Sequence, residues 1–140
     1  MFSALQSWLS QQFGPRSLGE RGERYAARYL RRLGYHIVGQ RVDMGAGELD
    51  IVAVDGRTVV FVEVKTRTSD AAGTPTDAID DPRQHRLTRA ALAYLKSHGL
   101  LEHAARFDVV AVTWPDGVRI PNIEHIRDAF PATGRGQFFS

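Results

Sequence analysis

The sequence contains no cysteine. Without cysteine the chain can form no disulfide, no thiolate metal site and no cysteine nucleophile, and the absence fits a reducing cytoplasm. No stretch approaches the roughly 18 uninterrupted apolar residues that a membrane helix requires, so we expect no membrane partner. The first thirteen residues also lack the basic start and the continuous apolar run of a secretory signal. We therefore expect a cytoplasmic protein.

Size, composition and charge suit one small domain with one core. The 140 residues are 43% hydrophobic, and 18 Lys and Arg against 16 Asp and Glu give a formal net charge of +2 at pH 7. Most of the positive charges are arginine, which pairs well with phosphate, but this balance alone favours nucleic-acid binding only slightly. We expect an amphipathic extension over residues 1–16, one domain over 17–132 and a flexible tail over 133–140.

The pattern from residue 18 to 33 predicts a helix. Ser17 and Glu20 have the spacing of a capping box, and Gly34 ends the apolar periodicity. Glu23 falls on the margin of the apolar stripe. Arginines gather on the other side of this helix: Arg21, Arg24, Arg28, Arg31 and Arg32. A solvated face and a phosphate-contacting face explain these arginines equally well.

Strands are predicted from short β-rich runs. Residues 35–40 form the first, and residues 48–54 and 57–65 form a hairpin around the dipeptide Asp55-Gly56, a strong turn signal. Residues 107–113 form a later strand, with a short partner expected at 118–120.

A second helix is predicted to begin after Asp81 as N-cap, with Pro82 at its first position, and to end at Gly99. The order of elements is helix, strand, hairpin, helix, strand. It indicates a mixed α/β domain in which helices flank a central sheet.

Four charged side chains of the hairpin are expected on one face of the sheet. A two-residue turn at 55–56 places Asp50 opposite Phe61 and Glu48 opposite Glu63. Because side chains alternate along a strand, Glu48, Asp50, Glu63 and Lys65 share a face. Asp50 and Glu63 are then diagonal neighbours, roughly 7–8 Å apart.

This grouping of carboxylates is unfavourable without a positive partner. Glu48 and Glu63 are like charges directly opposed, and Lys65 offsets only part of their repulsion. A divalent cation would offset more, and oxygen ligands without cysteine favour Mg²⁺ or Mn²⁺. The alternative is a salt-bridge cluster on an exposed sheet face, but the flanking Val and Phe residues favour a buried strand.

A set of ordered motifs carries a resemblance to a known family. The motifs are Gly22-Glu23, Gly47-Glu48-Leu49-Asp50, Phe61-Val62-Glu63-Val64-Lys65-Thr66-Arg67, Arg83-Gln84-His85-Arg86-Leu87, Arg106-Phe107-Asp108-Val109-Val110 and Ile126-Arg127-Asp128-Ala129-Phe130. The pair of motifs around Asp50 and Glu63 resembles the PD-(D/E)xK nuclease signature. Over about residues 18–130 the chain resembles the YraN family of small bacterial proteins, predicted endonucleases similar to archaeal Holliday junction resolvases.

The resemblance implies a restriction-endonuclease-like (PD-(D/E)xK) core and a set of roles. Asp50, Glu63 and the Val64 carbonyl would hold Mg²⁺ or Mn²⁺, which polarises the phosphate and lowers the pKa of a bound water. Lys65 would position that water or stabilise the developing charge. Glu23 matches a helix glutamate that supports the metal site in resolvase-like members; otherwise it is a partly buried Glu paired with an arginine. Glu48 is expected beside the ligands rather than among them.

Two positions depart from the pattern. Leu49 stands where the superfamily signature has proline, although the smaller family commonly has an aliphatic residue there. Arg83 stands where that family usually has lysine. Arginine keeps the positive charge but lacks the compact geometry of an ammonium.

The function expected from these motifs is metal-dependent hydrolysis of DNA, with branched or junction DNA as a candidate substrate. The candidates for phosphate contact are Arg24, Arg28, Arg31, Arg67, Arg83 and Arg86. The alternatives are a nucleic-acid-binding accessory protein without turnover and a small interaction module. Resolvase-like relatives act as pairs, and the apolar segment 2–13 has no evident place in so small a domain, so a homodimer is expected.

Overall fold

A computed structural model describes residues 17–69, 71, 73–75, 77 and 79–133 of the chain. The expected helix over 2–13, the rest of the extension and the tail from residue 134 lie outside the described residues. No helix within the described ranges is both long and apolar enough to cross a membrane.

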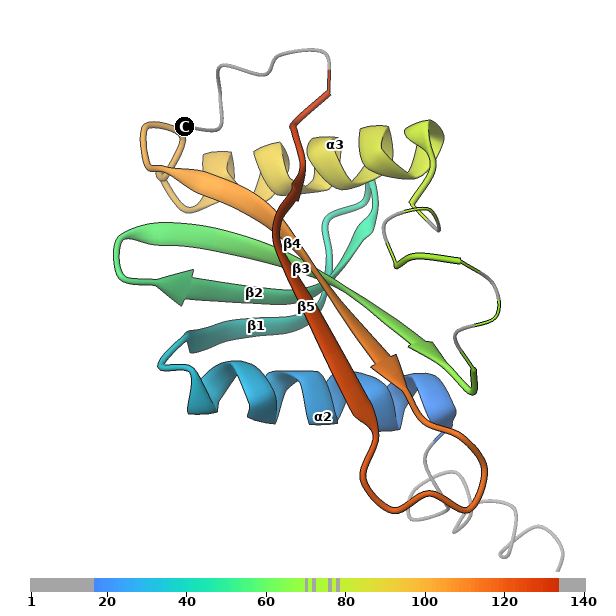
Figure 1. Cartoon of the computed structure of the whole chain (residues 1–140). Coiled ribbons are helices and arrows are strands. Elements are labelled where there is room, and N and C mark those ends of the chain that lie inside the picture. The colour runs from blue at the N-terminus through green and yellow to red at the C-terminus, as the bar shows by residue number, and fades with distance from the viewer. Residues whose placement is uncertain (1–16, 70, 72, 76, 78, 134–140) are drawn as a thin grey trace, which may run out of the picture.

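The described chain forms two long helices and a five-stranded sheet (Figure 1). In chain order these are α2 (Leu18–Arg32), β1 (His36–Asp43), β2 (Glu48–Asp55), β3 (Thr58–Arg67), α3 (Asp81–Ser97), β4 (Ala105–Thr113) and β5 (Asn122–Phe130). The strands lie in sequence order across the sheet. Only β3 and β4 are parallel, and α3 makes the crossover that a parallel pair requires.

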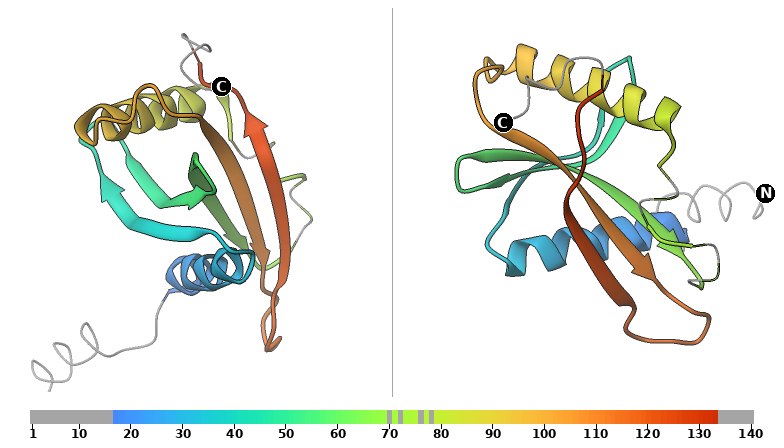
Figure 2. Two further views of the ribbon diagram at one scale, coloured as in Figure 1. Left: turned by 90° about the vertical axis from the view of Figure 1, so that its left-hand side faces the viewer. Right: turned by 45° about the horizontal axis from the view of Figure 1, so that its top comes forward.

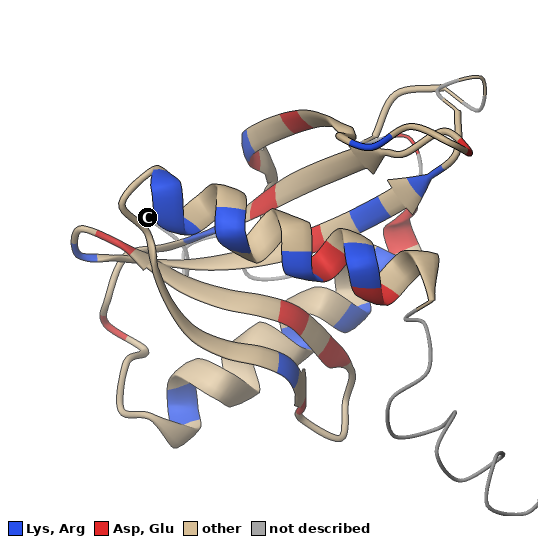
Figure 3. Ribbon diagram, turned by 90° about the horizontal axis from the view of Figure 1, so that it is seen from below, with Lys and Arg blue, Asp and Glu red and all other residues tan. Residues whose placement is uncertain are grey.

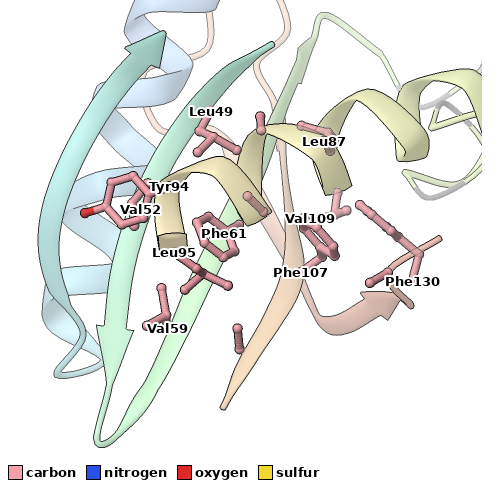
Figure 4. Close-up of a cluster of buried hydrophobic side chains, with 14 of the residues drawn as sticks. Leu49, Val52, Val59, Phe61, Leu87, Tyr94, Leu95, Phe107, Val109 and Phe130 are labelled. Carbon is pink, nitrogen blue, oxygen red and sulfur yellow. The ribbon is translucent and has the colours of Figure 1, made fainter. Parts of the chain in front are cut away.

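The two helices cover opposite faces of the sheet, so the fold has three layers and a core on each face (Figures 1 and 2). The core under α3 is built around Phe61, Tyr94 and Phe107 (Figure 4). The core under α2 contains Leu30 and Val60 among its buried residues. Successive residues of β3 alternate between the two cores, which explains why this strand is apolar on both faces. The predicted mixed α/β domain with flanking helices is confirmed.

Both helix starts depend on side-chain caps. Ser17 Oγ accepts a hydrogen bond from the Glu20 N–H (3.2 Å), as predicted for α2. The N-cap of α3 is Asp80, whose carboxylate accepts from the Arg83 N–H at 2.9 Å, so the assignment of Asp81 as N-cap was wrong by one residue. Pro82 is therefore the second residue of the helix and not the first. Proline is accepted at this position because the first-turn amides of a helix have no intrahelical hydrogen bond to lose.

The last strand lies later in the chain than predicted. Residues 118–120 are not a strand: Gly117 turns the chain with φ 77°, and the Val118 carbonyl accepts from the indole N–H of Trp114. The partner of β4 is β5, whose side chains mix exposed and buried positions. An edge strand with this pattern lacks the clean alternation on which a sequence prediction depends.

A buried polar network fixes β5 against β4. Asp108 is fully buried, and its carboxylate accepts hydrogen bonds from the Arg106 guanidinium (2.9 Å) and the Asp128 N–H (3.0 Å) and is paired with His125 (2.8 Å). Burial alone would raise the pKa of Asp108, but these partners hold it below its ordinary value. The network lies at a bulge where Asp128 has φ 52°. We assign it a structural role, because each buried polar atom has a partner.

Candidate active site

The observed hairpin register brings the two candidate carboxylates closer than the sequence suggested. Ile51 pairs with Val62 and Asp55 pairs with Thr58, so the turn residues are Gly56 and Arg57 and not Asp55 and Gly56. Gly56 has φ 62°, which suits the first position of a two-residue hairpin turn. Each residue of β2 therefore meets a partner two positions later than predicted. The faces are unchanged, because side chains alternate with a period of two.

Asp50 consequently lies directly opposite Glu63, and the expected pairing of Glu48 with Glu63 was wrong. The Asp50 side chain hydrogen-bonds to Glu63, and its Oδ2 also accepts from the Val64 N–H at 2.9 Å. Glu63 is only 4% exposed. Burial, and then the hydrogen bond and charge of Glu63, raise the pKa of Asp50 to about 8. With this pKa Asp50 keeps its proton near neutral pH, and a buried carboxyl of this kind argues against an exposed salt-bridge cluster.

Arg83 supplies the positive charge that Glu63 needs. Its Nε and Nη2 donate to the two oxygens of Glu63 at 3.1 Å and 2.9 Å, a bidentate ion pair. The Asp80 cap sets the first turn of α3, and this turn presents Arg83 to β3. The sequence suggested that Arg83 contacts phosphate, but the structure directs its guanidinium to a candidate metal ligand.

Lys65 and Glu48 lie at the rim of the carboxylate pair. Alternation along β3 places Lys65 on the face of Glu63, two residues or roughly 7 Å further along the strand. Lys65 is half-buried and has no hydrogen bond or ion pair to another described residue. Glu48 is exposed at the start of β2, where it pairs with Asp43 of β1, and it lies two residues before Asp50. Lys65 is therefore a cation of this face that is available to a ligand.

Glu23 approaches the site because α2 packs closely on β3 at Gly22. A Cβ at Gly22 would lie 1.9 Å from Thr66 Oγ1, so a larger residue would force the helix away. Glu23 itself forms an ion pair with Arg41 of β1 (2.8 Å), and its charge contributes to the raised pKa of Asp50. The alternative of a partly buried Glu paired with an arginine is thus the observed arrangement. Arg41 was not identified from the sequence, and its φ of 50° becomes visible only in the structure.

The six candidate arginines do not form one surface. Arg24, Arg28 and Arg31 are exposed on α2, whereas Arg86 is exposed on α3 across the sheet. Figure 3 shows the α2 side, where basic segments recur along the helix. Arg67 donates to the Gly73 carbonyl (2.8 Å) and to Thr113 Oγ1 (3.3 Å), so it fastens the loop after β3. Three of the six lie together on α2.

The carboxylate pair offers few ligands to a metal ion. Within the described ranges no three His, Cys, Asp or Glu side chains lie close enough to form a metal centre. Asp50, Glu63 and the Val64 carbonyl would give three protein oxygens, which suits Mg²⁺ because this ion usually retains several waters. The raised pKa of Asp50 also fits, because a bound cation would favour the charged carboxylate that burial and the neighbouring Glu63 disfavour. The residues fit a weak, oxygen-ligated divalent cation that competes with a proton and with Arg83.

We expect Asp50→Asn to remove a pH dependence from the free energy of unfolding measured in EDTA. The pKa of Asp50 is about 8 in the folded state against 3.8 ordinarily, so the folded protein keeps a proton that the unfolded chain has released. Wild-type stability should therefore fall relative to the variant by up to about 1.4 kcal/mol per pH unit between about pH 5 and 7, and level off above about pH 8. Urea unfolding across this range tests the prediction, and parallel curves would contradict it.

Comparison with known proteins identifies the family. The model of the "Uncharacterised protein family UPF0102" matches residues 22–112. A UPF0102 protein of Geobacter sulfurreducens is 50% identical over 115 residues, covering 81% of this chain and 88% of the relative. One from Rhodopirellula baltica is 46% identical over 125 residues, covering 87% of this chain and 75% of the relative. The matched region contains Asp50, Glu63, Lys65 and Arg83. The chain therefore belongs to the UPF0102 family, which is the YraN family that its sequence motifs indicated.

Proposed function

We propose that the protein is a Mg²⁺- or Mn²⁺-dependent endonuclease that hydrolyses phosphodiester bonds of DNA on a PD-(D/E)xK core. The observation that carries the proposal is Asp50 directly opposite Glu63, with Lys65 two residues further along the same strand. A carboxyl whose pKa is raised by burial and by a neighbouring carboxylate is unfavourable for folding, and such groups cluster at functional sites. The five-stranded mixed sheet with one helix on each face is in keeping with this core.

Each residue of the site has a distinct part in the proposed reaction. A bound cation would supply Lewis-acid polarisation of the phosphate and a more acidic water. Asp50 must lose its proton before it can act as a ligand, so cation binding should strengthen as the pH rises toward about 8. Glu63 and the Val64 carbonyl complete the protein ligands. Lys65, whose ammonium has no described partner, would stabilise charge that develops on the phosphate.

One observation favours a second function, a nucleic-acid-binding accessory protein without turnover. Arg83 already neutralises Glu63 through two hydrogen bonds, so a cation must share that carboxylate with a guanidinium or displace it. A protein without catalytic activity would be stable with the Arg83–Glu63 ion pair in place. The two functions differ in whether a divalent cation binds at Asp50.

A cleavage and cation-binding experiment separates the two functions. The substrates are duplex, single-stranded, flap and four-way DNA, each with Mg²⁺ or Mn²⁺, and the enzyme is wild type or Asp50→Ala. We expect cleavage of at least one substrate by wild type only. Thermal shift should show stabilisation by Mn²⁺ that Asp50→Asn abolishes. Equal shifts in both proteins, with no cleavage of any substrate, would replace the nuclease proposal with the accessory function.

A further inference from the structure

A groove of about 460 Å³ lies between α2 and the chain that leads into β5, away from the carboxylate pair. One wall is a single face of α2 that bears alternating aromatic and basic side chains: Tyr25, Arg28, Tyr29 and Arg32. The other wall consists of Ile120, Pro121 and Ile123. Among the described residues, no acidic side chain lines the groove. Its volume is within the range of sites that hold small organic ligands.

The two tyrosine rings of this groove are held in place from behind. The Tyr25 ring makes an edge-on contact with Trp114 (5.6 Å between centroids), and the Tyr29 ring makes one with His125 (5.6 Å). Neither hydroxyl bonds to another described residue. Rings fixed in this way lose little conformational entropy when a ligand stacks on them. The wall thus offers two preorganised aromatic surfaces and two unpaired hydroxyl groups.

The basic side chains of the groove indicate the charge of its ligand. Arg28 and Arg32 are exposed and have no ion pair with another described residue, unlike Arg83 and Arg106. Ile120, at 70% exposed, adds an apolar surface opposite the tyrosines. A ligand that contacts the tyrosine rings, the two arginines and the apolar surface of Ile120 carries a flat ring and a phosphate. Base stacking on aromatic side chains beside arginine-bound phosphates is the usual way in which proteins hold single strands.

We infer that this groove binds an unpaired nucleotide of a DNA strand, with the base against the tyrosines and the phosphate against Arg28 and Arg32. The inference deepens the proposed function and rests on it for the class of ligand. Both helices begin at the same end of the sheet (Figure 1), where Gly22 meets Thr66 and Arg83 meets Glu63. Tyr29 lies seven residues from Gly22, or roughly 10 Å along the helix. The groove therefore lies along α2 from the end of the sheet that carries the carboxylate pair, on the other face of the sheet.

The test compares matched variants of α2 in fluorescence anisotropy with a short labelled oligothymidylate, a DNA hairpin and thymidine monophosphate. Arg28→Ala with Arg32→Ala removes two charges from the groove, and Arg24→Ala with Arg31→Ala removes two exposed charges elsewhere on the same helix. We expect the groove pair to weaken oligothymidylate binding roughly tenfold more than the control pair does. Both pairs should weaken hairpin binding equally. Tyr25→Leu should also weaken oligothymidylate binding roughly tenfold, and Tyr25→Phe should retain it.

Three outcomes would overturn the inference. Equal effects of the two double variants would show that the arginines provide general charge only. Retained oligothymidylate affinity in Tyr25→Leu would exclude stacking. Thymidine monophosphate binding as tightly as the oligonucleotide would identify a mononucleotide site and not a strand site. Circular dichroism of each variant checks that it folds.

Failure of the inference can be told apart from failure of the nuclease proposal. If cleavage depends on Asp50 but the groove variants have no selective effect, the nuclease proposal is supported and the groove is not a binding site for an unpaired nucleotide. If the groove variants selectively lose oligothymidylate binding and wild type cleaves no substrate, the groove inference is supported and the accessory function is favoured. The two proposals use different residues on different faces of the sheet, so one set of variants does not disturb the other site.

Discussion

Lys65→Ala is expected to slow single-turnover DNA cleavage by roughly a hundredfold or more, while DNA affinity changes little. The ammonium lies on the face of the carboxylate pair and has no partner among the described residues, so its charge is available to the reacting phosphate. In a complex with DNA it would provide only one of several phosphate contacts. A group of this kind acts mainly where negative charge increases in the transition state.

Lys96→Ala is the matched control for this prediction. Lys96 is the other lysine of the chain and is exposed in the last turn of α3, far along the helix from Arg83. Its loss should leave the cleavage rate unchanged. Titrations of both variants at several salt concentrations, alongside cleavage, separate affinity from rate. If Lys65→Ala loses affinity and rate in equal measure, the lysine is only a phosphate anchor.

The second large effect is expected for Arg83→Ala, which should lower the free energy of unfolding by about 3 kcal/mol in EDTA. Removal of the guanidinium leaves buried Glu63 opposite Asp50 without its cationic partner. The same change frees both oxygens of Glu63, so Mn²⁺ should stabilise the variant more than it stabilises wild type. Arg83→Lys should lie between the two, because lysine keeps the charge and loses the bidentate geometry.

Arg86→Ala is the control, because Arg86 is exposed on the same helix and has no described partner. It should leave stability nearly unchanged and, as a candidate phosphate contact, weaken DNA binding with a shallower salt dependence. Both arginines were candidates for phosphate contact on sequence grounds, and the structure separates them. Urea unfolding with and without Mn²⁺ measures the effect. Equal stability of Arg83→Ala and Arg86→Ala would show that the ion pair contributes nothing to folding.

Much of the fold could be predicted because its signals are local. The α2 helix followed from apolar periodicity with a cap at Ser17, and the β2–β3 hairpin followed from Asp55-Gly56 between apolar runs. β5 could not be placed, because its pattern of exposure depends on β4 and on the bulge at Asp128. Propensity carries little information for an edge strand of this kind.

The sequence by itself determined which side chains share the site face and which family the chain belongs to. Alternation has a period of two, so an error of two positions in the hairpin register left Asp50 and Glu63 on one face. The motifs around these residues sufficed for the family, because their order and spacing are properties of the chain alone.

Only the tertiary structure decided the partners of the charged side chains. Arg83 meets Glu63 across 20 residues and Glu23 meets Arg41 across 18, and neither separation has a periodicity that a pattern could reveal. These pairs depend on how closely each helix packs on the sheet, which the cap at Asp80 and the missing side chain at Gly22 control. Ion pairing is a property of distance in space, and in a mixed sheet that distance is set by packing between elements far apart in sequence.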